Sequence, residues 1–253
     1  MIDLHTHLLP GVDDGSRTME NSLRVLERMR SEGVTDVACT PHLDASRAHE
    51  APFEAYAALR ADLQAKAPPG ITLHKGFEIM LDATSADLTD PRLALGSSKA
   101  VLVEFPREPL GQHSTDDLMQ LRASGVVPVI AHPERYQGIS LDRLYIWRDI
   151  GVVIQGDALL LLAAGRKGDF ARKALAEGLL DILASDNHGD ARALATVKLW
   201  LHEVGGDRHA HILMERNPRH LLDDEMLEGV PPLHEHKTIW DRLRELFTVG
   251  RGG

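Results

Sequence analysis

Short apolar runs of strand length recur along this chain, and segments with apolar residues at helical spacing lie between most of them. The strand-like runs are residues 2–5, 35–40, 71–77, 100–104, 127–131, 152–155 and 181–184. The segments expected to be helices are residues 17–32, 52–66, 114–124, 141–149, 169–178 and 190–204. Successive strands are spaced near the ~30 residues of a β–α–β unit, so the pattern predicts an α/β fold with parallel strands.

Six of the strand-like runs end at side chains that bind metal ions. These side chains are His5 and His7, His42, Glu78, Glu104, His132, and the pair Asp186 and His188. In a parallel barrel the carboxyl ends of the strands gather on one face, and active sites lie there. The recurrence therefore predicts a parallel α/β barrel of seven strands with its site at the C-terminal ends of the strands.

A doubly wound open sheet shows the same alternation of strands and helices. Such a sheet exposes mainly its switch point, whereas these ligands follow the first, middle and last strands. A closed ring brings all of them together, which favours the barrel.

The residue types at the strand ends indicate a multi-metal site. Histidine and carboxylate ligands suit Mn, Zn or Fe, and Asp14, in the loop after the first strand, offers a further carboxylate. A glutamate can bridge two ions, and paired ions can activate water and hold a phosphoryl group for in-line attack. Gln155 ends the sixth run and is interpreted as a hydrogen-bonding residue of the rim.

Two arginines follow predicted ligands closely. Arg135 comes three residues after His132, and Arg192 comes four residues after His188. A guanidinium group beside a metal cluster is suited to bidentate binding of phosphate oxygens. We therefore expect both arginines to be candidate catalytic residues that bind substrate.

Length and charge narrow the class of protein. The chain has 253 residues, which suits one barrel domain over residues 1–253, with residues 208–253 as C-terminal covering helices that include an amphipathic stretch at 238–247. The formal net charge is −10, which weighs against a nucleic-acid backbone as the main partner.

Cysteine content and hydropathy limit the possible catalytic mechanisms and cellular locations of the protein. The single cysteine, Cys39, allows no internal disulfide, and Ala45 stands where a cysteine phosphatase would carry its arginine. The chain begins without a signal-like segment, and no run approaches the ~20 apolar residues of a membrane span. These features together predict a cytoplasmic protein.

The motifs resemble those of the PHP superfamily, named for polymerase and histidinol phosphatase. Within it, the chain is similar to the bacterial capsular-polysaccharide protein-tyrosine phosphatases over about residues 1–222. The matching segments are residues 1–16, Thr40-Pro41-His42, Gly76-Phe77-Glu78, Val103-Glu104-Phe105, Ala131-His132-Pro133-Glu134-Arg135-Tyr136, Ser185-Asp186-Asn187-His188 and Asn217-Pro218. The chain departs from the family pattern after His42 and after Gln155, in loops expected to border the site.

The resemblance implies a (β/α)7 barrel with three metal ions, most commonly Mn²⁺, with Fe or Zn as alternatives. It assigns the ligands as His5, His7, Glu78 and Asp186 for one ion, Glu78, Glu104 and His132 for a second, and Asp14, His42 and His188 for a third. Arg135 would bind the substrate phosphate. Arg192 lies one residue nearer to the preceding histidine than the family's second arginine.

The same resemblance implies a phosphoric monoester hydrolase that acts on phosphotyrosine through metal-activated hydroxide. Its partner would be a phosphotyrosine protein, such as the tyrosine-rich tail of a polysaccharide-assembly kinase, and it would regulate capsular or exopolysaccharide synthesis. Three alternatives stay open. These are a small-molecule phosphatase, such as one for histidinol phosphate, or a phosphodiesterase; an amidohydrolase, although Glu104 stands where that class carries a lysine; and a non-catalytic metal-binding protein.

Overall fold

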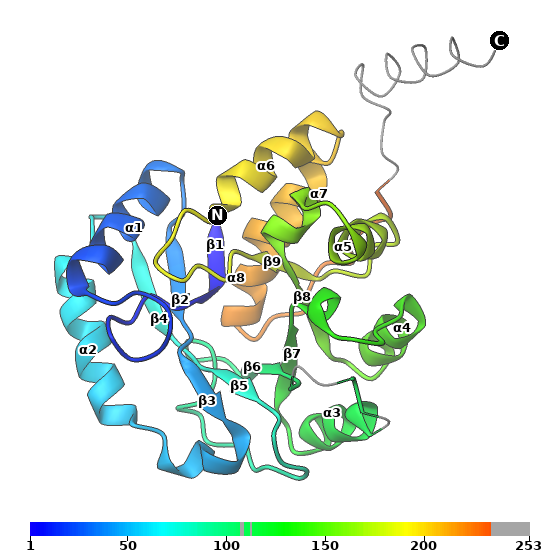
Figure 1. Ribbon diagram of the computed structural model, residues 1–253, viewed down its shortest axis with the longest axis horizontal. Coiled ribbons are helices and arrows are strands. Elements are labelled where there is room, and N and C mark those ends of the chain that lie inside the picture. The colour runs from blue at the N-terminus through cyan, green and yellow to red at the C-terminus, as the bar shows by residue number, and fades with distance from the viewer. Residues whose placement is uncertain (107–108, 112, 234–253) are drawn as a thin grey trace.

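Parallel strands form the centre of the fold, and helices surround them (Figure 1). The computed structural model describes residues 1–106, 109–111 and 113–233. The strands are β1 (Ile2–Thr6), β2 (Asp36–Cys39), β3 (His42–Asp44), β4 (Thr72–Lys75), β5 (Glu78–Met80), β6 (Ala100–Glu104), β7 (Val127–Ala131), β8 (Val153–Asp157) and β9 (Ile182–Ala184). The amphipathic stretch predicted at 238–247 lies outside the described residues.

The helices match the predicted positions closely. They are α1 (Met19–Ser31), α2 (Phe53–Lys66), α3 (Ser114–Ala123), α4 (Leu141–Asp149), α5 (Arg166–Ala176), α6 (Leu194–Glu203), α7 (Asp207–His211) and α8 (Asn217–Leu222). Tighter or wider helical turns occur at η1 (Ala45–Glu50), η2 (Pro133–Arg135), η3 (Ala158–Leu162) and η4 (Ile212–Arg216). In the part of the chain that the structure describes, no helix combines the length and the apolar character that crossing a membrane requires.

Side-chain hydrogen bonds explain where several helices begin. Thr18 and Ser140 cap α1 and α4 by accepting from backbone N–H groups of the first turn. Helix α6 starts four residues later than predicted, because Asn187 holds the preceding segment as a loop. The Asn187 side chain accepts from the N–H of Gly189 (2.8 Å) and donates to the carbonyl oxygen of Arg192 (2.8 Å).

The strands form two parallel sheets, with strand orders β1-β2-β4 and β3-β5-β6-β7-β8-β9. The order follows the chain throughout, unlike a doubly wound sheet, in which the order reverses at a switch point. Only Thr40-Pro41 separates β2 from β3, and only Gly76-Phe77 separates β4 from β5. The same two chain segments therefore contribute first to one sheet and then to the other.

The edge of β1 lies beside the segment that follows β9. Thr6 and Asn187 form an isolated parallel bridge, and the N–H of His7 donates to the carbonyl oxygen of Asn187 over 2.8 Å. The parallel α/β class predicted from the sequence is confirmed. Among the described residues there is no closed sheet, so a closed seven-stranded barrel is not confirmed.

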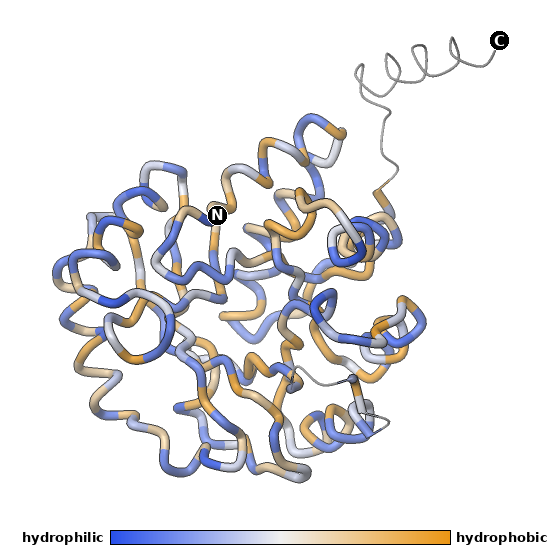
Figure 2. The backbone as a smooth tube through the Cα atoms, in the orientation of Figure 1, coloured by the Kyte–Doolittle hydropathy of each residue, from blue (hydrophilic) through white to orange (hydrophobic). Residues whose placement is uncertain are grey.

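Alternate strand residues divide the core into two layers. Ala38, Leu102 and Val129 belong to a cluster among the strands, whereas their neighbours in the chain, such as Val37 and Val103, pack with the helices. The peripheral helices accordingly alternate hydrophobic and hydrophilic residues along their length (Figure 2).

Helix α8 covers the end of the strands opposite the predicted site. Leu221 and Leu222 pack in the inner cluster, and Arg219 Nη2 lies 2.7 Å from a carboxylate oxygen of Asp36, where β2 begins. The amino ends of the strands are therefore covered, and their carboxyl ends are left to the ligands.

Candidate metal centre

Four candidate ligand atoms from three strands meet at one point. His5 and His7 stand at the end of β1, Glu78 begins β5, and Asp186 follows β9. Five of the distances among His5 Nε2, His7 Nε2, Glu78 Oε2 and Asp186 Oδ1 are 3.2 or 3.3 Å. Ligands about 2.1 Å from a common ion stand about 3.0–3.4 Å apart in tetrahedral or octahedral geometry, so this spacing fits one metal ion.

Hydrogen bonds on the far sides of the two imidazoles orient them. His5 Nδ1 lies 2.9 Å from Gln155 Oε1, and His7 Nδ1 lies 2.8 Å from Asp13 Oδ2. The Gln155 amide nitrogen donates to the carbonyl oxygen of Gly156, which leaves its oxygen to face His5. Because both partners accept, each Nδ1 donates, and each Nε2 faces the shared point, where it can bind a metal ion once it has lost its proton. Metal-binding histidines are usually oriented in this way.

Glu78 connects this group to a second one. Its Oε1 lies 2.7 Å from His132 Nε2, and its Oε2 lies 3.0 Å from His42 Nδ1. Glu104, at the end of β6, stands 3.9 Å from both of these histidines. Glu78 therefore occupies the position that a carboxylate bridging two ions would take.

A third group forms where the loop after β1 returns to the strand ends. Asp14 Oδ1 lies 3.2 Å from His42 Nε2 and 3.5 Å from His188 Nε2, and a ligand atom of His7 lies within 4.8 Å of all of them. Gly15 permits this return, because a Cβ there would overlap the backbone oxygen and the Cβ of His7. The loop can therefore fold directly onto β1.

Two of the candidate ligands have unusual backbone conformations. His132 and Asp186 adopt φ angles of 34° and 49°, in the left-handed region that residues other than glycine rarely occupy. The N–H of His132 donates to the carbonyl oxygen of Gln155, which helps to hold that conformation. Such conformations cluster at functional sites, where the surrounding structure maintains them.

The charges of the cluster perturb one another strongly. Burial lowers the pKa of His5, but Glu78 and Asp186 outweigh burial and raise it to about 9. Burial and the nearby Glu78 raise the pKa of Glu104 to about 7. Burial raises the pKa of Glu78 itself, yet His5 and the other histidines hold it well below its usual value. Without cations the cluster therefore retains protons, which bound metal ions would displace.

Both predicted arginines reach the cluster through Asp186. Arg135 Nη2 lies 2.5 Å from Asp186 Oδ2 and 2.5 Å from Asp157 Oδ2. Arg192 Nη1 lies 3.2 Å from the same Asp186 oxygen. Burial lowers the pKa of Arg135, but Asp186 and Asp157 raise it above its ordinary value, so this guanidinium stays charged.

A cavity of about 760 Å³ opens above the cluster. Seven of the nine predicted ligands and both arginines line it, while His5 and His7 are buried beneath. Phe105, Leu159 and Leu160 supply an apolar wall, and Lys167 adds a third cation. The cavity therefore combines a ligand-rich floor, cationic side chains and a surface suited to an aromatic ring.

One atom of the cluster indicates that a cation belongs there. Asp186 Oδ1 is buried and has no hydrogen-bond partner among the residues that the structure describes, although two imidazole nitrogens face it. Unsatisfied buried carboxylate oxygens are costly, and a metal ion would satisfy this one. The donor set of histidines and carboxylates fits a borderline divalent ion.

The structure brings all nine predicted ligands into one continuous cluster, but sequence reasoning missed several supporting residues. It took Gln155 for a rim residue, whereas Gln155 is buried and orients His5. It did not assign Asp13 or Asp157 to the histidine and the arginine that they contact. Their only signals were position, since Asp13 precedes a predicted ligand and Asp157, the last residue of β8, belongs to a segment that departs from the family pattern.

Comparisons with known proteins identify the family to which this chain is similar. The family model described as capsular polysaccharide synthesis, CpsB/CapC, matches residues 1–223. The tyrosine-protein phosphatase CpsB of Streptococcus pneumoniae is 26% identical over 244 residues, which cover 90% of this chain and 100% of that protein. The tyrosine-protein phosphatase YwqE of Bacillus subtilis is 26% identical over 203 residues, which cover 74% of this chain and 77% of that protein.

A solved structure has a fold similar to that of this chain. It comes from a study of YwqE from Bacillus subtilis and CpsB from Streptococcus pneumoniae, described as unique metal-dependent tyrosine phosphatases. The TM-score is 0.78 at 25% sequence identity, and the match covers 93% of this chain and 100% of that one. The similarity therefore extends over the whole arrangement of strands that carries the candidate ligands.

Proposed function

The chain belongs to the capsular polysaccharide synthesis family CpsB/CapC, and on that premise we propose that it is a metal-dependent protein-tyrosine phosphatase. The observation that carries the proposal is the meeting of two imidazole nitrogens and two carboxylate oxygens at 3.2–3.3 Å, with Arg135 bound to one of those carboxylates. Relatives over most of the chain are named tyrosine-protein phosphatases.

We propose that the site binds three Mn²⁺ ions, with the ligand sets that the resemblance implies. The three clusters of ligand atoms support this division, with two differences. His7 belongs to the cluster of His5, Glu78 and Asp186 and also to that of Asp14, His42 and His188. The geometry groups His42 with Glu78 and Glu104, and also with Asp14 and His188, so His42 stands between two of the positions. His132 completes the middle set through its contact with Glu78.

Divalent ions bound at these positions would activate a water molecule and neutralise charge on the phosphoryl oxygens. Arg135 binds the phosphate oxygens through its planar guanidinium group, which Asp157 and Asp186 already orient. Leu159 and Phe105 receive the aromatic ring and exclude water from one side of the cavity. The leaving phenolate has an aqueous pKa of ~10, so it needs less protonation than an alkoxide would.

We also propose that the two sheets act as one distorted seven-stranded ring. The pairs β2–β3 and β4–β5 would each count as one interrupted strand, and the bridge between Thr6 and Asn187 would close the ring. The covering position of α8 supports one domain over the described residues. This arrangement explains why ligands from β1, β5, β6 and β9 meet.

The proposed partner is a phosphotyrosine protein of polysaccharide assembly, such as the tyrosine-rich tail of a kinase. The family name and the names of the relatives support this partner. We propose a cytoplasmic location. Tyrosine phosphorylation, which produces the substrate, uses ATP and occurs in the cytoplasm.

The test is a rate assay of metal-depleted protein to which Mn²⁺ is restored. It compares a phosphotyrosine peptide, histidinol phosphate and a phosphodiester, and repeats each assay with Arg135→Ala and His132→Ala. We expect Mn²⁺-dependent hydrolysis with a strong preference for the peptide and a large loss in both variants. Preference for histidinol phosphate would assign the site to a small-molecule phosphatase, and hydrolysis of none of the three would overturn the proposal.

A further inference from the structure

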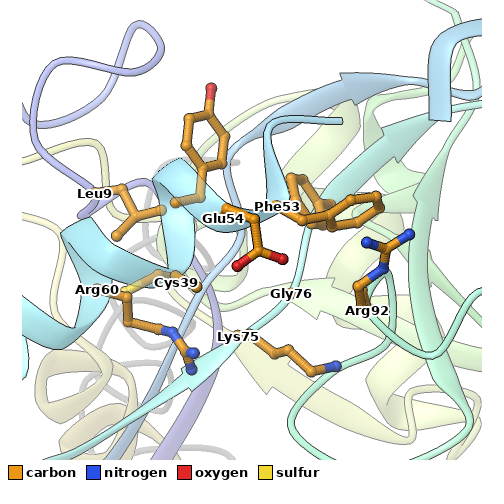
Figure 3. A pocket seen from close by; sticks show the side chains of 11 residues that line it. Leu9, Cys39, Phe53, Glu54, Arg60, Lys75, Gly76 and Arg92 are labelled. Atoms are coloured by element: carbon orange, nitrogen blue, oxygen red, sulfur yellow. The ribbon is translucent and has the colours of Figure 1, made fainter. Parts of the chain in front are cut away.

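A second cavity, of about 100 Å³, is lined by residues of α2 and β4 and by none of the nine candidate metal ligands (Figure 3). Three aromatic side chains, Phe53, Tyr56 and Phe77, form much of its wall, with Leu9 and Cys39 beside them. The Phe53 and Phe77 rings meet edge to face with centroids 5.8 Å apart, and Tyr56 stacks on Phe77 at 6.0 Å. A closed cavity of about 150 Å³ holds a benzene molecule, so this smaller, open one accommodates part of a single aromatic ring.

Cationic side chains surround this apolar wall. Arg60, Lys75 and Arg92 line the cavity, and among the described residues Glu54 is the only acidic one that lines it (Figure 3). The chain as a whole has ten more acidic than basic residues. Three cations around one apolar cavity therefore form a local positive charge in a chain whose net charge is negative. This local charge favours an anionic ligand.

The three cations differ in how far their charge is already neutralised. Arg92 pairs with Asp90 at 2.6 Å and covers the Phe53 ring at 3.9 Å. Lys75 Nζ donates to the carbonyl oxygens of Pro91 and Ala94, which carry no net charge. Arg60 is half-buried and forms no ion pair with any residue in the described part of the chain. The charges of Arg60 and Lys75 are therefore available to a ligand.

The cavity is also connected to the proposed active site. Tyr56 lines both this cavity and a neighbouring one of about 280 Å³. His42, a candidate metal ligand, lines both that neighbouring cavity and the large one above the metal cluster. A peptide bound at the metal cluster can therefore reach the second cavity along the surface formed by η1 and the start of α2.

We propose that this cavity is a second, non-catalytic site for an aryl phosphate, which binds another phosphotyrosine of the same polypeptide substrate. Part of the ring would enter the cavity among Phe53, Tyr56 and Phe77, and the dianion would face Arg60 and Lys75. This inference rests on the proposed phosphatase function, and it adds a substrate class to it. The preferred substrates would be segments that carry two phosphotyrosines.

The test uses the full chain loaded with Mn²⁺ and peptides that cannot be hydrolysed. Each peptide carries one or two phosphonomethyl-phenylalanine residues, in which carbon replaces the phosphate ester oxygen, with spacings from three to ten residues. We expect one range of spacings at which the second group strengthens binding by about tenfold or more, because linked sites gain from effective concentration. Isothermal titration calorimetry measures the affinities.

Two variants with opposite expected effects make the test sharp. Arg60→Ala should abolish the gain from the second group while leaving the affinity for the singly modified peptide unchanged. Glu54→Gln removes the acidic lining residue and should increase the gain. Arg208, an exposed arginine of α7, provides the matched control, and Arg208→Ala should behave like the wild type.

The possible outcomes separate this inference from the proposed function. If singly phosphorylated peptides are hydrolysed but no spacing gives a gain, the second site is refuted and the phosphatase function stands. A gain that persists in Arg60→Ala, or that glutamate in place of the second group reproduces, would also overturn the aryl-phosphate site. If the singly phosphorylated peptide is not hydrolysed at all, the proposed function itself fails.

Discussion

Replacing Asp13 tests whether His7 is a metal ligand, and asparagine should be more harmful there than alanine. In the structure Asp13 accepts two hydrogen bonds, one from the backbone N–H of Gly15 (3.0 Å) and one from His7 Nδ1 (2.8 Å). A carboxylate has two acceptor oxygens, so it satisfies both donors. An asparagine has only one acceptor and presents an NH₂ group on its other side.

Asp13→Asn therefore forces a conflict in the metal-bound state. Because the N–H of Gly15 needs the amide oxygen, the NH₂ group would face His7 Nδ1, and His7 would have to move its proton to Nε2. That nitrogen is the atom that lies 3.2 Å from Glu78 Oε2 and 3.3 Å from Asp186 Oδ1, so a proton there blocks metal binding. If the asparagine amide is rotated by 180° instead, its NH₂ group faces the backbone N–H of Gly15, and two donors oppose each other.

The expected magnitudes follow from this geometry. Asp13→Ala removes the orienting partner, which typically lowers metal affinity about 10–100-fold. In Asp13→Asn a hydrogen-bond donor is also left without an acceptor. This costs about 1–3 kcal/mol, so the Mn²⁺ affinity should fall by about a further tenfold. The two variants should therefore rank wild type, then alanine, then asparagine.

Mn²⁺ titration of the metal-depleted proteins by calorimetry measures this ranking, and circular dichroism checks that each variant is folded. Asp142, an exposed residue of α4, provides a matched control, since Asp142→Asn should not change the affinity. If Asp13→Asn binds Mn²⁺ more tightly than Asp13→Ala, the tautomer argument is wrong. If neither variant differs from the wild type, His7 does not bind the metal.

Three further predictions concern the same site. Arg135→Lys keeps the charge but loses the planar guanidinium group, so kcat/KM for a phosphotyrosine peptide should fall about 100-fold in steady-state assays; unchanged kinetics would remove Arg135 from the site. The carboxylates around His5 raise its pKa to about 9 in the metal-free protein, so this histidine is protonated at neutral pH and must lose that proton to bind Mn²⁺. Apparent Mn²⁺ affinity should therefore rise with pH between about 6.5 and 8.5, and a flat profile would contradict the assignment. Burial raises the pKa of the Cys39 thiol to about 12, so iodoacetamide should leave the activity intact while a chelator abolishes it; activity that survives the chelator would refute the metal mechanism.

The alternation of strands and helices could be predicted because it depends on local patterns. The apolar runs at residues 100–104 and 127–131 became β6 and β7 with the same bounds, and α4 occupies residues 141–149 as predicted. Strands β3 and β5 were missed, because each has only three residues and β3 carries no buried residue. Pairing with neighbouring strands, rather than their own sequence, makes them strands.

The candidate ligands could be found because each follows an apolar run directly. The family resemblance supplied a division into three groups, but residue spacing could not show that a ligand stands between two of them, because that depends on distances across the strand ends. His42 illustrates this point, since its two ring nitrogens face Glu78 on one side and Asp14 on the other.

The sequence by itself therefore determined the fold class, the family and the residues able to bind metal, because period, spacing and side-chain chemistry are local properties. Only the tertiary structure decided which partner orients each ligand, as Gln155 does for His5 across 150 positions of the chain. It also placed Arg60 and Lys75 around an aromatic cavity that no spacing in the sequence predicted. The reason is physical: hydrogen bonds and charge interactions act over a few ångströms of space, and the fold sets those distances between segments that are remote in the chain.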